Sequence, residues 1–103
     1  MHYRLPAVML ISLMLAAVAA YPTRADVTKG RQLAEVWCAN CHVTSSSPAG
    51  NLQQGPPSFP TIARARTADQ LRAFLSHPHG AMPDLSLTRA EIDDLVGYIE
   101  TLR

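Results

Sequence analysis

The C-terminal part of the chain has the clearest periodic pattern of apolar and polar positions. Thr88-Arg89-Ala90-Glu91 has the form of a capping box, in which the first and fourth side chains satisfy free backbone N–H groups at the start of a helix. Behind it, apolar residues recur every three or four positions, which is typical of a helix with one buried side. These apolar residues are Ile92, Leu95, Val96, Ile99 and Leu102. The pattern predicts a helix from Thr88 to Leu102.

Two further helices are predicted upstream. Asp26 can cap a helix from Val27 to about Cys41, because its carboxylate can accept hydrogen bonds from the free N–H groups of the first turn. One face of this helix would carry the residues that recur at helical spacing, which are Val27, Gly30, Ala34, Trp37 and Cys41. A second capping box, Thr67-Ala68-Asp69-Gln70, predicts a short middle helix. His77-Pro78 would end it, because the residue before a proline disfavours the helical conformation.

The remaining segments of the chain are predicted to be loops. From Val43 to Pro60 the sequence is rich in serine, glycine and proline, which cannot sustain a regular element. A loop of this length in a small domain is usually functional or ordered by another group. No segment shows the sustained alternation of a β-strand. The expected fold class is therefore all-α, with three main helices and long loops.

The N-terminal residues 1–25 are expected to be a secretory signal peptide. A basic start is followed by an apolar run of 16 residues, Leu5 to Ala20, and then by small residues at plausible cleavage positions. Cleavage after Ala25 would leave a mature domain of residues 26–103, and cleavage after Ala20 is the alternative. A retained membrane anchor is also possible, although the apolar run is shorter than the roughly 20 residues that span a bilayer.

The mature domain is small and nearly neutral. Residues 26–103 contain seven Lys and Arg against eight Asp and Glu, which gives a net charge of minus one. A nucleic-acid-binding protein would be expected to carry a strongly basic face, so this partner class is excluded. A domain of about 78 residues is close to the size at which an apolar core alone is marginal. A large apolar cofactor would supply part of that core.

The segment Cys38-Ala39-Asn40-Cys41-His42 matches C-x-x-C-H, the attachment sequence of a c-type haem. The two thiols can each form a thioether to the porphyrin, and the adjacent histidine can then bind the iron. A zinc site would need two more ligands at a suitable spacing, and none follows. A redox-active C-x-x-C of the thioredoxin kind would need a βαβ context, which is missing. The motif thus predicts one covalently attached haem c, held by Cys38, Cys41 and His42.

With these residues in place, the mature chain resembles the small class I c-type cytochromes over nearly its whole length. The resemblance depends on the order of its features: Gly30, the C-x-x-C-H motif, Gly55-Pro56, Met82-Pro83, and a terminal helix with Leu95 and Tyr98. It implies a small cytochrome c fold around one haem, with the first and last helices crossing at Gly30. It also implies that the carbonyl of Pro56 accepts a hydrogen bond from His42. The family often has an aromatic residue at the position of Ala34, so Trp37 is expected to pack the helix crossing instead. Both Trp37 and Tyr98 are expected to be core aromatics.

Met82 is the candidate for the second axial ligand of the iron. It is the only methionine after the predicted signal peptide, and it lies in an irregular segment where an apolar filler would be less expected. The resemblance supports this assignment. The alternative ligands are His77 and His79, which otherwise are polar residues of a turn.

The expected function is one-electron transfer in the periplasm, with no bond made or broken in a substrate, so the protein is not expected to be an enzyme. A monomer that docks transiently on redox proteins at the haem edge, without a membrane span after signal cleavage, fits this function. Two alternatives stay open. One is a haem-based sensor or peroxide-reducing enzyme in which Met82 does not bind the iron, and the other is a dedicated haem subunit of a larger oxidoreductase.

Overall fold

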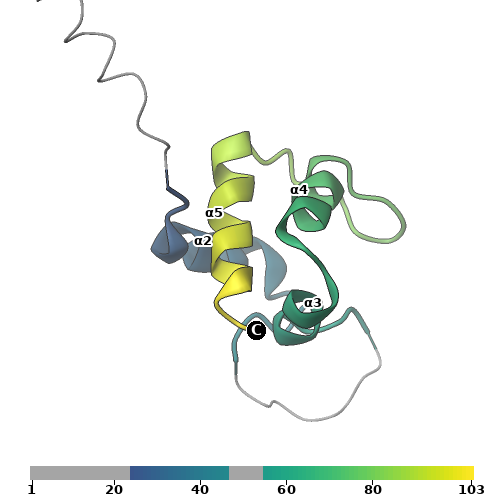
Figure 1. Ribbon diagram of the computed structural model, residues 1–103. Coiled ribbons are helices and arrows are strands. Elements are labelled where there is room, and N and C mark those ends of the chain that lie inside the picture. The colour runs from purple at the N-terminus through teal and green to yellow at the C-terminus, as the bar shows by residue number, and fades with distance from the viewer. Residues whose placement is uncertain (1–23, 47–54) are drawn as a thin grey trace, which may run out of the picture.

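The computed structural model describes residues 24–46 and 55–103. In these ranges the chain forms four α-helices and one π-helical turn, and no strand (Figure 1). They are α2 (Val27–Leu33), the π turn η1 (Ala34–Cys38), α3 (Phe59–Ala65), α4 (Ala68–Ser76) and α5 (Arg89–Glu100). The all-α fold is thereby confirmed. The predicted signal peptide, except for its last two residues, and positions 47–54 of the predicted loop lie outside the described residues.

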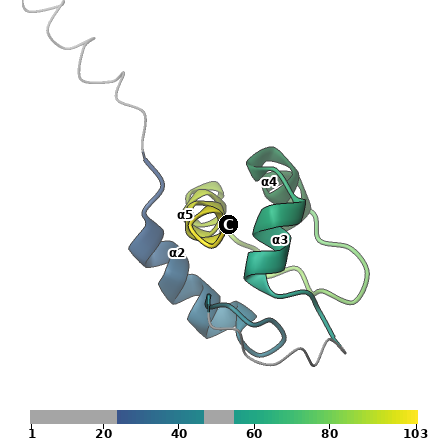
Figure 2. The same cartoon turned by 60° about the horizontal axis from the view of Figure 1, so that its bottom comes forward.

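Helix α5 is the central element of the fold. Figure 2 shows it nearly end-on, with α2 on one side and α3 and α4 on the other. Helix α2 makes the most extensive contact with α5, while α4 and α3 pack against α5 more lightly. The apolar side predicted for α5 is confirmed, because Ile92, Leu95, Val96 and Ile99 are buried and Leu102 packs against them.

The crossing of α2 and α5 occurs at Gly30, as expected. Gly30 is buried, and a Cβ built on it would lie 2.5 Å from the carbonyl carbon of Asp94 and 2.9 Å from Cβ of Tyr98. A side chain at position 30 would therefore overlap the backbone of α5. At the start of α2, the Asp26 N–H donates to the Asp94 carboxylate at 2.7 Å, which ties the same two helices together.

The predicted helix caps are present. The Asp26 carboxylate accepts from the Lys29 N–H at 3.0 Å. Both capping boxes, the one from Thr67 to Gln70 and the one from Thr88 to Glu91, have reciprocal hydrogen bonds of 2.8–3.2 Å. His77 is the C-cap of α4, where the middle helix was predicted to end. These helix ends depend on local hydrogen bonds, which is why the sequence predicts them well.

Helix α3 is a difference from the prediction, which placed the whole segment from Val43 to Pro60 in a loop. The Ser58 side chain accepts from the Thr61 N–H at 3.3 Å and caps the helix, and Pro60 lies in its first turn. Proline is compatible with this position, because its missing N–H would have no partner inside the helix. Phe59 is buried and anchors the helix in the core. The three expected helices are thus joined by a short fourth one.

The π turn changes which residues of the first helix are buried. The Ala39 N–H donates to the Ala34 carbonyl at 3.0 Å, a bond from residue i+5 to residue i that takes one more residue than an α-helical turn. Ala34 and Cys38 are therefore buried, while Trp37 is 56% exposed. The prediction that Trp37 is a core aromatic and packs the helix crossing is wrong, since Ala34 occupies that place. The helix also ends at Cys38 rather than at Cys41.

Candidate haem-attachment site

Cys38 and Cys41, at the end of the first helix, differ in their exposure to solvent. Cys38 is the last residue of the π turn and is 5% exposed, whereas Cys41 lies in the following turn and is exposed. Both thiols are free. Burial raises the pKa of the Cys38 thiol above its ordinary value, because the thiolate would lose its hydration. One thiol thus belongs to the core and the other to the surface.

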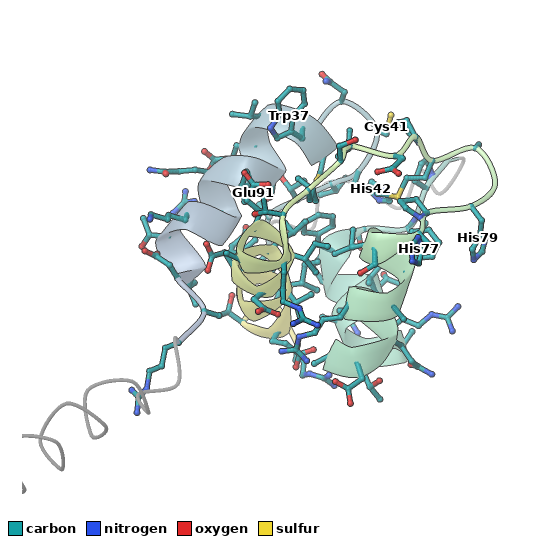
Figure 3. All side chains as sticks on the ribbon, turned by 90° about the horizontal axis from the view of Figure 1, so that it is seen from above. Trp37, Cys41, His42, His77, His79 and Glu91 are labelled. Atoms are coloured by element: carbon teal, nitrogen blue, oxygen red, sulfur yellow. The ribbon has the colours of Figure 1, made fainter. Side chains whose placement is uncertain are left out.

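The turn after Cys38 positions His42. The N–H groups of Cys41 and His42 both donate to the Cys38 carbonyl, at 3.1 and 2.9 Å. These bonds fold the motif back on itself within four residues, so that His42 is half-buried while Cys41 remains at the surface. Figure 3 shows Cys41 at the edge of the molecule and His42 farther inside.

One ring nitrogen of His42 is already engaged. Nδ1 lies 2.7 Å from the carbonyl oxygen of Pro57. A carbonyl oxygen can only accept, so Nδ1 carries the proton and the lone pair is on Nε2. A hydrogen bond of this kind fixes the tautomer and the ring plane of a metal-binding histidine. Pro56 was expected to supply the carbonyl, and this expectation is corrected: the next residue, Pro57, supplies it.

Four contacts hold the Pro57 carbonyl in place beside His42. The Phe59 N–H donates to the Val43 carbonyl at 2.9 Å, which pins the start of α3 to the residue after His42. The Phe59 ring lies beside the His42 ring, with centroids 5.7 Å apart, and beside the Tyr98 ring at 6.4 Å. The Tyr98 hydroxyl donates to the Thr44 carbonyl. The expectation that Tyr98 is a core aromatic is confirmed, since it is 8% exposed.

The role of Phe59 in this site was not predicted from the sequence. A signal was present in Ser58-Phe59-Pro60-Thr61, where a serine N-cap precedes a proline in the first helical turn. That signal would have predicted α3, but the contact with His42 joins two segments that are distant in sequence.

Met82, His77 and His79 lie in the connection between α4 and α5. Met82 is half-buried and packs against the core cluster, whereas both histidines are exposed. The His79 ring meets the edge of the Phe74 ring, with centroids 4.9 Å apart. Figure 3 shows both histidines away from Trp37, with His77 at the end of α4 and His79 on the outer part of the connection.

The cysteines and histidines do not form a metal cluster by themselves. Within residues 24–46 and 55–103, no group of three or more His, Cys, Asp or Glu side chains could hold a metal ion. The donor set of two free thiols and one oriented imidazole instead fits a haem that is attached at its edge and bound through its iron.

Comparisons with known proteins decide the family. Residues 25–99 match the family model described as "Cytochrome C oxidase, cbb3-type, subunit III". The chain is also 36% identical over 105 residues to Cytochrome c-552 of Bradyrhizobium diazoefficiens, in an alignment that covers all of this chain and 99% of the relative. This chain belongs to the c-type cytochromes. No solved structure matches it.

As a small monohaem c-type cytochrome, the protein carries one covalently attached haem c, and Cys38 and Cys41 are the residues that fit its attachment. When bound, the haem supplies an iron that takes up and releases one electron. The polypeptide supplies a buried thiol at Cys38, a surface thiol at Cys41 and an imidazole at His42 whose Nε2 is free.

Proposed function

We propose that this cytochrome is a periplasmic one-electron carrier in which His42 and Met82 are the axial ligands of the haem iron. The observation that carries the proposal is the hydrogen bond from His42 Nδ1 to the Pro57 carbonyl at 2.7 Å. It leaves Nε2 as the donor atom and holds the ring in one orientation, which an iron ligand needs in both oxidation states.

Met82 is supported as the second ligand by its environment. It is the only methionine after residue 14, and its side chain is half-buried against the core. The exposed His77 and His79 would have to leave the solvent to reach the core. A thioether also suits the function, because it raises the reduction potential relative to a second imidazole.

The polypeptide favours electron transfer by fixing the positions of the proposed iron ligands. The Phe59 ring packs between the rings of His42 and Tyr98. The Phe59 N–H and the Tyr98 hydroxyl donate to the carbonyls of Val43 and Thr44, which fixes the segment that follows His42. A site with two fixed ligands needs little rearrangement when the oxidation state changes, and it has no open position for a substrate. The protein is therefore proposed to be a carrier and not an enzyme.

Export to the periplasm is proposed from the N-terminal sequence. The basic, apolar and small-residue regions of positions 1–25 have the order of a signal peptide, and the family match begins at residue 25. In the part of the chain that the structure describes, no helix has both the length and the apolar content that a membrane span requires. The proposed form is a monomer that meets its redox partners transiently.

A second candidate function is favoured by the family model, whose description names a subunit of an oxidase. In that case the same haem chemistry would serve one fixed partner. The two functions differ in whether the purified cytochrome is isolated alone or within a complex of several chains.

Absorption spectra of the purified, exported protein test the proposal. We expect the long-wavelength sulfur-to-iron band in the ferric form and no binding of carbon monoxide by the ferrous form. Size-exclusion chromatography of the native protein should show a single small chain. Ready binding of carbon monoxide would contradict the carrier and favour the sensor or enzyme. Co-elution with a larger oxidoreductase would favour the subunit.

A further inference from the structure

Asp94 of α5 is a half-buried carboxylate without a cationic side chain beside it. Among the described residues, no Lys or Arg side chain lies within ion-pair distance of Asp94. The neighbouring Asp93, in contrast, pairs with Arg72 of α4 at 2.9 Å. A carboxylate that is partly removed from water is stabilised by a nearby positive charge, so a cation beside Asp94 would be favourable.

The hydrogen-bond partner of the Asp94 carboxylate is the backbone nitrogen of Asp26. The Asp26 N–H donates to Oδ1 of Asp94 at 2.7 Å, although the two residues are 68 positions apart. In an uncut chain this nitrogen is a neutral amide. Cleavage of the signal peptide after Ala25 would make it the free α-amino group of the mature chain, whereas cleavage after Ala20 would leave it an amide.

We propose that removal of the signal peptide after Ala25 creates an ion pair between the α-ammonium group of Asp26 and the carboxylate of Asp94. The inference rests on the proposed export. A signal peptidase adds one water molecule across the Ala25–Asp26 peptide bond. The Ala25 carbonyl becomes a carboxylate that leaves with the signal peptide, and the Asp26 nitrogen takes up protons and becomes an ammonium. A charge-assisted hydrogen bond, which is the stronger kind, then replaces the neutral one.

The charged groups around the Asp26 nitrogen favour this ion pair. Two carboxylates face the new ammonium: that of Asp94, and that of Asp26 itself, which caps α2 by accepting from the Lys29 N–H at 3.0 Å. The Lys29 side chain is exposed, and Asp93 is engaged by Arg72. The free N–H groups at the start of α2 disfavour a positive charge there, and the Asp94 carboxylate offsets this effect.

The ion pair joins the start of α2 to α5 close to the point where the two helices cross. Gly30, at the crossing, follows Asp26 by one helical turn, and its N–H donates to the Asp26 carbonyl at 2.9 Å. The first helix then continues to Cys38 of the attachment motif. Removal of the signal peptide therefore strengthens the packing of the helix that carries this motif.

The alternative cut after Ala20 would give up this charge and keep Ala25. The Cβ of Ala25 lies against α5 at Gly97. Ala25 is exposed, so the contact buries only part of one methyl group and contributes little. The half-buried Asp94 carboxylate would then keep a neutral partner.

Mass spectrometry of the exported, haem-loaded protein is the first test. We expect a chain that starts at Asp26. A chain that starts at Tyr21 would overturn the inference and leave the proposed export intact. A chain that keeps the apolar run from Leu5 to Ala20 would overturn the inference and contradict removal of the signal peptide as well. The carrier function is tested separately, by the binding of carbon monoxide.

The second test measures the pKa of the Asp26 amino group by NMR, from the pH dependence of the Asp26 Cα signal. Asp94→Asn removes the charge but keeps a hydrogen-bond acceptor, so it should lower this pKa by about 0.3 or more, as expected for a partly exposed ion pair. Asp93→Asn is the matched control, because it makes the same change one residue away, on a carboxylate that Arg72 engages. The inference is overturned if Asp94→Asn lowers the pKa no more than Asp93→Asn does.

A third measurement relates the ion pair to stability. An amino group whose pKa is raised by folding stabilises the protein fully below its unfolded pKa of about 7.7 to 8.0, and this stabilisation is lost as the pH rises through the folded pKa. The denaturation midpoint of the unmodified protein should therefore exceed that of Asp94→Asn by more at about pH 6 than at about pH 9.5. Comparing the two proteins at each pH cancels titrations elsewhere in the molecule.

A chain that keeps Ala25, exported with a different signal peptide, is the control for this measurement. Its Asp94 carboxylate accepts from a neutral amide at every pH, so the midpoint difference caused by Asp94→Asn should change much less with pH. The same change with pH in both chains would overturn the inference, because the α-amino group of Asp26 would then not be its source.

Discussion

Gly30 of α2 lies directly against the backbone of Asp94 in α5, where a Cβ would overlap the Asp94 carbonyl group. The atoms in its way belong to the backbone of a buried helix, which cannot move aside as a flexible side chain can. We therefore expect Gly30→Ala to lower the free energy of unfolding by about 1 to 3 kcal/mol, despite the better helix propensity of alanine. Gly30→Val should cost more. The midpoint of denaturant unfolding of the haem-loaded protein measures both.

Gly97→Ala is the control for this prediction. A Cβ at position 97 would meet Cβ of Ala25 at 2.8 Å, and Ala25 lies in the exposed segment before α2, which can shift. This variant should lose less stability than Gly30→Ala. Equal midpoints for the two variants would mean that the helices do not cross at Gly30 in solution.

Replacing both Cys38 and Cys41 by alanine should abolish haem attachment. Thioethers survive denaturation, so the unmodified protein should keep haem-dependent peroxidase staining on a denaturing gel, and the double variant should lose it. It should also lose most of its folded population, because so small a domain depends on the haem for its core. Each single variant serves as a control and should keep part of the stain. Stable haem-free protein from the unmodified gene would contradict the attachment.

Met82→Ala should open the iron to external ligands if Met82 is the second axial ligand. The long-wavelength band of the ferric form should disappear, and carbon monoxide, cyanide or azide should then bind. Met82→His should keep six ligands but lower the reduction potential, because imidazole is the stronger donor to ferric iron. Absorption spectra and redox titration measure these changes.

His77→Ala and His79→Ala are the controls for Met82. Both side chains are exposed, so their removal should leave the spectrum and the exclusion of ligands nearly unchanged. If the absorption spectrum of the ferric form changed in one histidine variant and stayed unchanged in Met82→Ala, the second axial ligand would be that histidine.

Tyr98→Phe should weaken the support of His42 without removing the aromatic packing. The hydroxyl that donates to the Thr44 carbonyl is lost, which should cost about 1 kcal/mol, while the ring remains beside Phe59. We expect faster hydrogen exchange at the Phe59 amide, which donates to the neighbouring Val43 carbonyl. Tyr98→Leu should cost more, since it also removes the ring. An unchanged exchange rate in Tyr98→Phe would show that the hydroxyl does not hold this segment.

Much of the helical structure follows from local sequence. Asp26, Thr67 and Thr88 begin their helices through hydrogen bonds to residues three positions away, and the apolar side of α5 repeats at helical spacing. Such interactions involve neighbours along the chain, so the sequence alone predicts them. The same holds for the attachment motif, since C-x-x-C-H places the two thiols and the imidazole within five residues.

The sequence could not predict the details that depend on distant segments. The acceptor for His42 is the carbonyl of Pro57 and not that of Pro56, because the hydrogen bond from Phe59 to Val43 fixes how the backbone of this segment turns. The sequence predicts that the first and last helices cross at Gly30, but the distance from Gly30 to the Asp94 backbone is set by the packing of two whole helices.

The exposure of Trp37 most clearly separates what the local sequence predicts from what the tertiary structure decides. By sequence alone, Trp37 shares an apolar helical face with Gly30 and Ala34, and burial is the natural expectation. The π turn adds one residue at this point and brings Cys38 to the buried side in place of Trp37. The sequence by itself determined the helices and the haem motif, because both depend on neighbouring residues. Only the tertiary structure decided which side of the motif is buried, because that depends on how the first helix packs against α5.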